Sequence, residues 1–480
     1  MKFIYDNIGS ITSHFYKTTL SPKKLKHQVN LRASMLKSKQ IGCNDKVIIL
    51  HGGTPTFFCD LFAVWEAGAC AVCLNPDTTN NEIRNIISFL QASVVLVDDF
   101  NKYNLDCDVL NLAVDQPVKT SGQQNNHSNL DDDALMLFTS GTTGTPKGVV
   151  HTFRSLLARI EMNQLFIKKD HLSKTMCPLP THFGHGLIGN CLTALLSGGD
   201  IILVPGGNIE VVSDLGGLID HYKITFISSV PSMWKLVLQL SSRPENNSLK
   251  RVHIGSAPLS SELWNEVINW SGADEVVNMY GITETANWIC GASSKLYDPD
   301  DGLIGTSWGG VIAVIDNNGN INKFGEGEIV VQTSSVMKGY FNLDKITGKV
   351  LKNGWFYTGD IGNIDLNGKI YLTGRKKFEI NRSGLKIHPE EIDSLLERHD
   401  DIVEACAFSI PDNIAGEIIG IAVALKEDSD TTIEELIAWC SDKIIKEKTP
   451  DKWFIVEEVP KTDRGKINRD TVALECTKNY

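Results

Sequence analysis

The chain lacks the features that would place it in a membrane or on a nucleic acid. It has no run of about 18 apolar residues, so a membrane-spanning helix is not expected. Its first residues, 1–7, lack the basic and then apolar layout of a signal peptide, and we expect a cytoplasmic protein. Acidic residues outnumber basic ones by 58 to 46, and the net charge of −12 argues against a nucleic acid as the main partner.

Cysteine is present, but not in a pattern that predicts disulfides or a zinc site. The 11 cysteines are an odd number and are scattered along the chain. Cys70 and Cys73 have redox or zinc spacing, yet they lie in an apolar run and no second pair follows. We expect burial of both, because a free cysteine packs as a small hydrophobic residue. Free cysteines also suit the reducing cytoplasm.

Length and periodicity predict a large α/β domain with a smaller companion. At 480 residues the chain is too long for one ordinary domain. Strand-like and helix-like runs alternate, which predicts a largely parallel sheet layered with helices. The expected strands cover 46–50, 71–74, 94–97, 135–138, 201–204, 225–228 and the stretch closing at 177–180, and the expected helices cover 57–66, 81–91, 151–166, 230–240 and a segment from 181–187 to about 196. Residues 101–133 are largely polar and predict a connection.

A Gly- and Thr-rich stretch follows the apolar run at 135–138. It reads Thr139-Ser-Gly-Thr-Thr-Gly-Thr-Pro-Lys-Gly148. Its glycines let the backbone approach a ligand, and its hydroxyls and Lys147 add donors that suit a polyphosphate. A Walker A loop is excluded, because Pro146 stands at the position of its second glycine and removes an N–H group. Taken by itself, the stretch is also compatible with an ordinary surface turn.

Two later segments carry groups that suit a nucleotide. The strand that begins at Arg251 ends in the small-residue turn Gly255-Ser-Ala-Pro258, where a flat ring could approach the backbone closely. In Asn278-Met-Tyr-Gly-Ile-Thr-Glu-Thr285 an aromatic ring can stack on a purine, and Asn278 can bond its edge. Thr283 can bond a phosphate, and the carboxylate of Glu284 is a hard oxygen ligand for Mg²⁺.

The last third of the chain adds two more candidate elements. Asp360, in Trp355-Phe-Tyr-Thr-Gly-Asp360, can accept bonds from both ribose hydroxyls, and Arg375 follows 15 residues later as a cation for ribose or phosphate. Beyond residue 374 the pattern changes to a compact α+β unit, with helices over 389–396 and 432–445 and strands over 402–410 and 418–425. In Pro460-Lys-Thr-Asp-Arg-Gly-Lys466 a glycine turn presents Lys466.

These motifs, in their order and spacing, resemble those of the adenylate-forming superfamily, which includes acyl-CoA synthetases, firefly luciferase and peptide-synthetase adenylation domains. The resemblance runs from the strand near Lys46 to Lys466. It implies an α/β fold with a large N-terminal domain of mostly parallel sheets layered with helices, over 1–374. A small, mobile α+β domain would follow over 375–480, with its hinge near Lys377.

The resemblance also implies roles for individual residues. Lys466, Thr283 and Glu284 would be catalytic, with Glu284 as the metal ligand. The cofactor-binding residues would be Thr139, Ser140, Gly141, Thr142, Thr143, Gly144, Lys147, Gly255, Ser256, Ala257, Asn278, Tyr280, Gly281, Asp360, Leu372, Arg375 and Gly384. The pocket for the acid would include His182, Phe183, Ile282, Ala286 and Trp288, with Phe183 at the position where relatives carry a histidine. A metal site at His182 and His185 is disfavoured, because no carboxylate or cysteine stands nearby.

The implied activity is an ATP- and Mg²⁺-dependent acid–thiol ligase that forms an acyl-adenylate and passes the acyl group to a thiol. The Asn381-Arg-Ser-Gly384 pattern favours thioester formation, with CoA as the expected acceptor. A carrier-protein phosphopantetheine is the alternative, since the region before the phosphate loop is short. A luciferase-like oxygenase and a non-catalytic nucleotide-binding relative also stay open. Relatives that activate amino acids hold the ammonium with an aspartate in this region, and no aspartate lies between Asp170 and Asp200, which disfavours an α-amino acid. The implied pocket residues favour a short, aromatic or hydroxylated acid. We expect a monomer or a homodimer.

Overall fold

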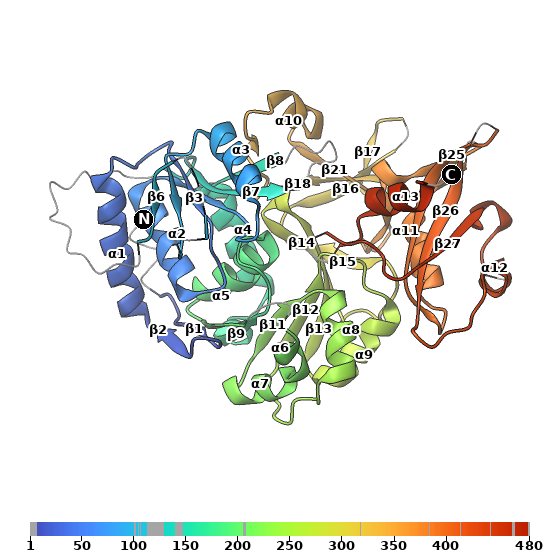
Figure 1. Cartoon of the computed structure of the whole chain (residues 1–480), viewed down its shortest axis with the longest axis horizontal. Coiled ribbons are helices and arrows are strands. Elements are labelled where there is room, and N and C mark those ends of the chain that lie inside the picture. The colour runs from blue at the N-terminus through green and yellow to red at the C-terminus, as the bar shows by residue number, and fades with distance from the viewer. Residues whose placement is uncertain are drawn as a thin grey trace. The chain divides into compact units, whose positions relative to one another are not determined.

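The computed structural model describes residues 7–99, 102–103, 105, 107–112, 129–139, 147–204, 208–316, 318–383, 385–412, 414–441, 443–462 and 466–478. The chain forms two compact units (Figure 1). Unit 1 comprises residues 1–299, 305–311 and 332–356, and unit 2 comprises 300–304, 312–331 and 357–480. The α/β class predicted from the sequence is confirmed. The domain boundary predicted between residues 374 and 375 stays a prediction.

The first sheet of unit 1 has the strand order β19-β8-β7-β4-β3-β5-β6. Strands β3 to β7 pair in parallel, whereas β8 forms an antiparallel hairpin with β7 and β19 pairs antiparallel with β8. The carboxyl ends of β3, β4 and β7 therefore share one edge, the usual location of ligands in such sheets. The bounds are β3 Lys46–Ile49, β4 Cys70–Cys73, β5 Val94–Leu96, β6 Val109–Leu110, β7 Asp133–Thr139, β8 Lys147–Thr152 and β19 Gly339–Tyr340.

The helices around this sheet begin and end where the sequence provides caps. Thr54 and Pro55 start α2, and Gly68 ends it in the left-handed conformation (φ 91°), which glycine adopts without strain. Thr79 and Glu82 form a reciprocal capping box at the start of α3. Helix α2 is almost entirely buried. The bounds are α1 Pro22–Ser38, α2 Pro55–Ala67, α3 Asn80–Leu90, α4 Phe153–Phe166 and, near β19, α10 Asp344–Val350.

The second sheet of unit 1 has the order β14-β13-β12-β11-β9-β10-β1-β2. Its central strands are parallel, and β14 and β2 close its ends antiparallel. Helices α8 and α9 lie beside β11 to β13 (Figure 1). The strands are β1 Ile11–Ser13, β2 Thr18–Leu20, β9 Lys174–Cys177, β10 Asp200–Leu203, β11 Phe226–Ser229, β12 Arg251–Gly255, β13 Glu275–Ile282 and β14 Asn287–Ser293. The helices are η3 His171–Ser173, the π-helix η4 His185–Leu192, α5 Thr193–Leu195, α6 Ile209–Ser213, α7 Leu215–Tyr222, α8 Pro231–Leu240, α9 Ser261–Ser271 and η5 Thr283–Thr285.

Four of the described strands have residues in both units, and one of them, β18 (Gly325–Gln332), lies in unit 2 except for its last residue. The C-terminal half of β15 (Leu303–Ser307) pairs with β14 inside unit 1. Strand β16 (Val311–Ile315) lies in unit 2 after its first residue, and β21 (Trp355–Ile364) lies there after its second. The two residues of β21 in unit 1 pair with β20 (Leu351–Lys352).

Unit 2 contains two sheets. One has the order β17-β16-β18-β21-β22, and the other has the order β24-β23-β26-β25 with β27 beside β26. The second has an apolar cluster on each face, one under α11 and α12 and one under α13. The strands are β17 Ile321–Asn322, β18 Gly325–Gln332, β22 Ile370–Arg375, β23 Ile380–Arg382, β24 Leu385–Ile387, β25 Ile402–Asp412, β26 Gly416–Leu425 and β27 Lys452–Val456. The helices are η6 Lys376–Phe378, α11 Pro389–Leu396, α12 Ile433–Ser441, η7 Lys446–Lys448 and α13 Arg469–Thr477.

The structure corrects several expected elements. The helix predicted over 151–166 begins only at Phe153, because residues 147–152 form the hairpin strand β8. The polar connection over 101–133 contains the short strand β6. The helix predicted over 432–445 ends at Ser441. Burial of Cys70 and Cys73 is confirmed.

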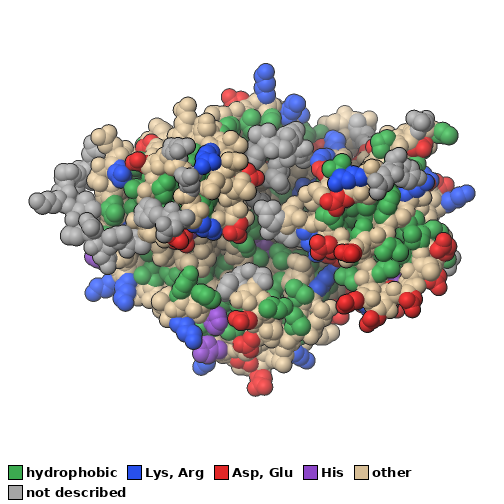
Figure 2. All heavy atoms as spheres, viewed as in Figure 1, with side chains coloured by type: hydrophobic (Ala, Val, Ile, Leu, Met, Phe, Trp, Pro, Cys, Tyr) green, Lys and Arg blue, Asp and Glu red, His purple; other side chains and the backbone are tan. Residues whose placement is uncertain are grey.

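The described surface carries charges of both signs. On the face shown in Figure 2, described basic and acidic side chains are interspersed, without one continuous basic area. Among the described residues, no helix combines the length and the apolar character needed to cross a bilayer.

Candidate active site

The two ends of the Gly- and Thr-rich loop lie side by side at the edge of the first sheet. Thr139, the last residue of β7, pairs with Lys147, the first residue of β8. The ammonium of Lys147 lies 5.2 Å from the ring centre of Tyr340, so the cation faces an aromatic surface. The loop residues between them, 140–146, lie outside the described residues, and they include the predicted ligand-binding residues Ser140, Gly141, Thr142, Thr143 and Gly144.

The turn with Thr283 and Glu284 is held against the same hairpin. The hydroxyl of Tyr340 donates to Glu284 Oε1 at 2.8 Å. His151 Nε2 lies 2.8 Å from the carbonyl of Thr283, which can only accept, so Nε2 carries the proton. Burial lowers the pKa of His151 to about 4, and the ring is neutral at pH 7. The structure thus brings together Lys147, Thr283 and Glu284, which stand far apart in the sequence.

Strand β13 supplies the predicted nucleoside residues of unit 1. Asn278 and Tyr280 are buried, and a β-bulge follows Tyr280. A Cβ atom on Gly281 would lie 2.3 Å from the carbonyl oxygen of Asn287, so the bulge itself requires glycine there. The close packing of β13 and β14 therefore explains Gly281 independently of any ligand.

The predicted adenine turn is connected to a histidine. Ser256 has a left-handed φ of 70°, and a Cβ on Gly255 would lie 2.9 Å from the carbonyl oxygen of Met279. His185 bonds the hydroxyl of Ser256 through Nδ1 (2.8 Å) and that of Ser228 through Nε2 (2.6 Å). Both ring nitrogens are therefore engaged by serines. Ala257, the third residue of the predicted turn, is half-buried.

The predicted acid-pocket residues divide by exposure. His182, Phe183 and Ile282 are half-buried, whereas Ala286 and Trp288 are buried. The Trp288 indole packs edge-on against His185, with ring centres 5.4 Å apart, and against His253 at 4.6 Å. A Cβ on Gly189 in η4 would lie 2.9 Å from the Trp288 ring. Trp288 therefore fills the interior behind η4, which limits the space available there.

In unit 2 the predicted ribose residues lie directly opposite each other. Asp360 on β21 pairs with Arg375 on β22, and Arg375 Nε lies 2.8 Å from Asp360 Oδ1. The Asp360 side chain is 5% exposed and that of Arg375 is 53% exposed. Leu372, on the same strand as Arg375, is half-buried and pairs with Gly362. The 15-residue spacing noted in the sequence is the length of one antiparallel hairpin.

The predicted hinge and the C-terminal lysine also belong to unit 2. Lys377 lies in η6, and its Nζ lies 2.7 Å from Asp470 Oδ2 at the start of α13. Exposed Lys466 is held through its carbonyl, which accepts from the N–H of Thr462 at 2.7 Å. Gly384 lies outside the described residues.

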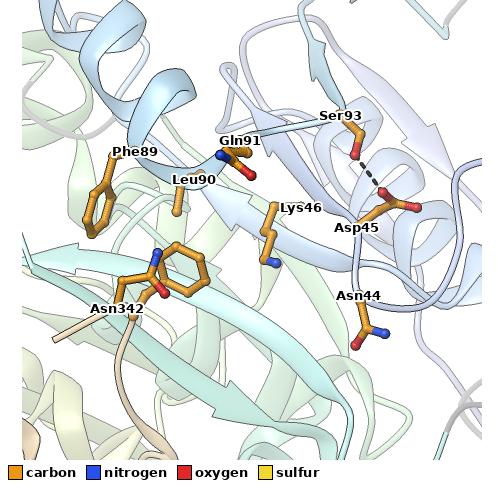
Figure 3. Close-up of a pocket in the computed structure, with 9 residues that line it drawn as sticks. Asn44, Asp45, Lys46, Phe89, Leu90, Gln91, Ser93 and Asn342 are labelled. Carbon is orange, nitrogen blue, oxygen red and sulfur yellow. Dashed lines mark hydrogen bonds between the residues drawn. The ribbon is translucent and has the colours of Figure 1, made fainter. Parts of the chain in front are cut away.

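Unit 1 contains a pocket of about 370 Å³ (Figure 3). Its lining includes Phe341 and Asn342, the two residues that follow Tyr340 in the sequence. In Figure 3, Lys46, Phe89 and Asn342 surround it from three different segments. The Phe341 ring lies 5.1 Å from the Lys46 ammonium and 5.5 Å from the centre of the Phe89 ring. None of the predicted site residues lines it. Its lining anchors the segment that carries Tyr340.

Three residues of the site were missed from the sequence. Tyr340 lies outside the motifs described above, and the pairing of β19 with β8 brings it to Lys147. His151 follows the loop by four residues, and a single histidine there gives no signal without the fold. His185 was considered only as a metal ligand. Each acts through a contact between segments distant in sequence.

The donor set suits Mg²⁺ bound together with a phosphate. Among the described residues no group of three or more His, Cys, Asp or Glu could form a metal cage. Glu284 offers one half-buried carboxylate, and it shares the partner Tyr340 with Lys147. Mg²⁺ commonly uses one or two carboxylates, substrate phosphates and water. Glu284 therefore fits the role of the one protein ligand.

Comparison with known proteins agrees with this geometry. The family model described as AMP-binding enzyme matches residues 9–341, and the model of the AMP-binding enzyme C-terminal domain matches 391–466. A probable CoA ligase of Humulus lupulus is 30% identical over 95% of this chain and 91% of its own length. The oxalate–CoA ligase of Arabidopsis thaliana is 30% identical over 95% and 93%.

A solved structure of similar fold supports the same assignment at the level of the fold. The o-succinylbenzoate CoA synthetase of Bacillus subtilis, in complex with its acyl-adenylate intermediate, superposes with a TM-score of 0.86 at 24% identity, covering 97% of this chain and 95% of that one. The resemblance seen in the sequence motifs is thereby confirmed. The chain belongs to the AMP-binding enzyme family and is an AMP-forming acid–thiol ligase.

Proposed function

We propose that the enzyme joins a small carboxylic acid to CoA in two steps. In the first, the carboxylate of the acid attacks the α-phosphorus of ATP, which gives the acyl-adenylate and pyrophosphate. In the second, the thiol of CoA displaces AMP and loses its proton, which gives the thioester. The observation that carries the proposal is the convergence of Lys147 and Glu284 on Tyr340, because it combines a phosphate-binding cation with a metal-binding carboxylate.

The residues divide the first step between them. The loop from Thr139 to Lys147 holds the β- and γ-phosphates, and Tyr280, Asp360 and Arg375 hold the nucleoside. Glu284 holds Mg²⁺, which neutralises phosphate charge when it is bound. Lys466 stabilises the charge that builds up on the α-phosphate, an interaction made chiefly in the transition state. The carboxylate is itself the nucleophile, so this step needs no protein base.

The second step uses a different arrangement of the C-terminal part. We propose that rotation about Lys377 withdraws Lys466 and brings Gly384 to the passage for the thiol. A glycine such as Gly384 fits this role, because the absence of a side chain leaves room for the narrow pantetheine chain of CoA. A Gly384→Trp variant should form acyl-adenylate and fail to form thioester. Thioester formation at the normal rate in that variant would contradict the assignment.

The substrate is proposed to be a short, aromatic or hydroxylated acid. The buried Trp288 restricts the space behind η4, while His182 and Phe183 offer half-buried polar and aromatic contacts. Relatives at 30% and 28% identity are named oxalate–CoA ligase and 2-succinylbenzoate–CoA ligase, which act on small acids. Another relative, 32% identical over 73% of this chain, is named for long-chain fatty acids, so chain length must be tested.

The deciding experiment is incubation with ATP, Mg²⁺ and an acid panel, with either CoA or a phosphopantetheine-loaded carrier protein, read by mass spectrometry. The panel should include oxalate, o-succinylbenzoate, 4-coumarate and a C16 fatty acid. We expect AMP, pyrophosphate and a CoA thioester of a small acid. Thioester on the carrier protein alone would replace CoA as acceptor, and strong activity only on the C16 acid would refute the small-acid proposal.

A further inference from the structure

We propose that Tyr340 is a positioning residue that fixes the carboxylate of Glu284 and thereby sets the affinity of the ATP complex for its divalent cation. This rests on the proposed function, in which Glu284 is the metal ligand. Neither the sequence motifs nor the comparisons assign a role to Tyr340. The contacts of β8, β19 and the Glu284 turn carry the proposal.

The strand register places Tyr340 between the loop lysine and the metal carboxylate. Tyr340 on β19 pairs with Val149 on β8, and residues two apart on a strand share a face. Lys147 and His151 flank Val149 on that face. From it, Lys147 faces the Tyr340 ring, and His151 holds the carbonyl of Thr283. One face of β8 thus aligns the whole Thr283–Glu284 turn.

The segment that carries Tyr340 is fixed on several sides. The N–H of Tyr340 donates to the Thr347 hydroxyl at 2.9 Å, and the N–H of Phe341 donates to the carbonyl of Gly148 at 2.8 Å. The N–H of Met337 donates to the carbonyl of Glu284, also at 2.8 Å. The Phe341 ring lies against the Lys46 ammonium and the Phe89 ring. Figure 3 shows Lys46 and Phe89 on separate segments. Such anchoring fixes the hydroxyl before any ligand arrives.

The hydrogen bond leaves one carboxylate oxygen for a cation. Tyr340 donates to Oε1 of Glu284, and Oε2 has no hydrogen bond within the part of the chain that the structure describes. A tyrosine phenol carries its proton at neutral pH and can act as the donor in this bond. Outer partners that orient a ligating carboxylate commonly contribute 10–100-fold to metal affinity.

A purely structural role is the competing explanation, because Tyr340 also packs in a small apolar cluster with Val149, Met337 and Phe356. Tyr340→Phe separates the two roles. The substitution keeps the ring, its cluster contacts and its backbone pairing, and it removes only the hydroxyl. Tyr222→Phe is the matched control, because the Tyr222 hydroxyl is also hydrogen-bonded. Its partner is His14, the residue that follows strand β1 in unit 1.

The test uses the full-length enzyme and Mn²⁺ as the probe. Binding of Mn²⁺ in the presence of saturating ATP is measured by electron paramagnetic resonance for the wild type, Tyr340→Phe, Glu284→Gln, the double variant and Tyr222→Phe. We expect Tyr340→Phe to weaken Mn²⁺ binding by about 10–100-fold. The effect should vanish in the Glu284→Gln background, because the two residues act as a unit. Activity should recover largely at high Mg²⁺, and ATP binding without metal should be unchanged.

Each contrary outcome is decisive. Normal Mn²⁺ binding by Tyr340→Phe, with weakened binding by Glu284→Gln, would overturn the role of Tyr340 and leave the proposed function standing. Normal binding by both variants would remove Glu284 from the metal site and overturn both proposals. A large loss of melting temperature in ligand-free Tyr340→Phe, or an equal effect in the Glu284→Gln background, would assign Tyr340 to the core.

Discussion

In unit 1 the charged site residues are held by neutral groups, whereas in unit 2 they are held by other charges. Glu284 accepts from the Tyr340 hydroxyl, and the turn it belongs to is held by neutral His151. Asp360 is instead paired with Arg375, and Lys377 with Asp470. A carboxylate held by a neutral donor keeps its charge available for a cation. A carboxylate already paired with a cation has less to offer a metal, but its remaining lone pairs can still accept hydrogen bonds from a ribose.

Charge pairing in unit 2 also reaches its interior. Arg469, at the start of α13, bonds the carboxylate of Asp393 at 2.7 Å and donates to the carbonyl of Ala407. It also lies 3.7 Å from Glu390. These contacts join α13, the helix that follows Lys466, to α11, the helix that follows the proposed hinge. Burial raises the pKa of Asp393 to about 6 although Arg469 opposes this shift, and the carboxylates around Arg469 raise the pKa of its guanidinium.

The largest expected effect comes from breaking this buried pair. Arg469→Met leaves Asp393 buried without its cation and should lower the stability of unit 2 by about 3–5 kcal/mol. Differential scanning calorimetry measures the change. Arg154→Met is the control, because Arg154 pairs with Asp131 at the surface and no measurable change is expected there. Equal melting curves for both variants would contradict the distinction between buried and exposed pairs.

The next effect concerns Lys466. Lys466→Ala should slow acyl-adenylate formation by about 10² or more while ATP affinity stays nearly the same, because the role proposed for the lysine is exerted mainly in the transition state. Single-turnover pyrophosphate release and ATP binding measure the two quantities. Lys448→Ala, which removes an ion pair with Glu391 in the same unit, is the matched control. An unchanged rate of AMP formation would remove Lys466 from the mechanism.

A smaller effect tests the neutral support in unit 1 through its pH dependence. The pKa of His151 is lowered from 6.5 to about 4 in the folded protein, so the unfolded chain binds the proton first as the pH falls. The stability that this neutral ring contributes is complete above about pH 6.5 and is lost between there and pH 4. At pH 5 the loss amounts to about 2 kcal/mol.

His151→Asn removes this titration. Between pH 7.5 and pH 5, the wild type should therefore lose about 2 kcal/mol more unfolding free energy than the variant. Denaturant unfolding at the two pH values measures the difference, and the other buried histidines cancel because both proteins contain them. Parallel pH profiles would show that His151 is protonated in the folded state.

The smallest effect is expected at the exposed ion pair of the proposed hinge. Asp470→Asn breaks the contact with Lys377, whose side chain is 40% exposed and that of Asp470 64%. Surface ion pairs contribute little to stability, so the melting temperature should stay nearly the same. The rates of both half-reactions should change by less than about threefold. Rapid-quench assays of adenylation and of thioester formation measure this. A selective loss of one half-reaction would instead make the pair part of the hinge motion.

Much of the architecture followed from local patterns. Alternating strand-like and helix-like runs predicted the parallel sheets, and α11 occupies the predicted range 389–396. Of the hairpin that contains the loop, the first strand, β7, was predicted and the second, β8, was not. The end of β8 was assigned to the helix that follows it. Strands β16 to β18 were not predicted, since their polar and apolar residues carry no clear signal apart from their neighbours.

The sequence by itself determined the family and the chemical character of the site, because motifs such as 139–148 and 278–285 carry their chemistry within a few consecutive residues. Only the tertiary structure decided how those motifs are held. Tyr340, His151 and His185 act across strand pairings and turns that join distant segments. Such contacts depend on register and packing, which no short stretch of sequence specifies.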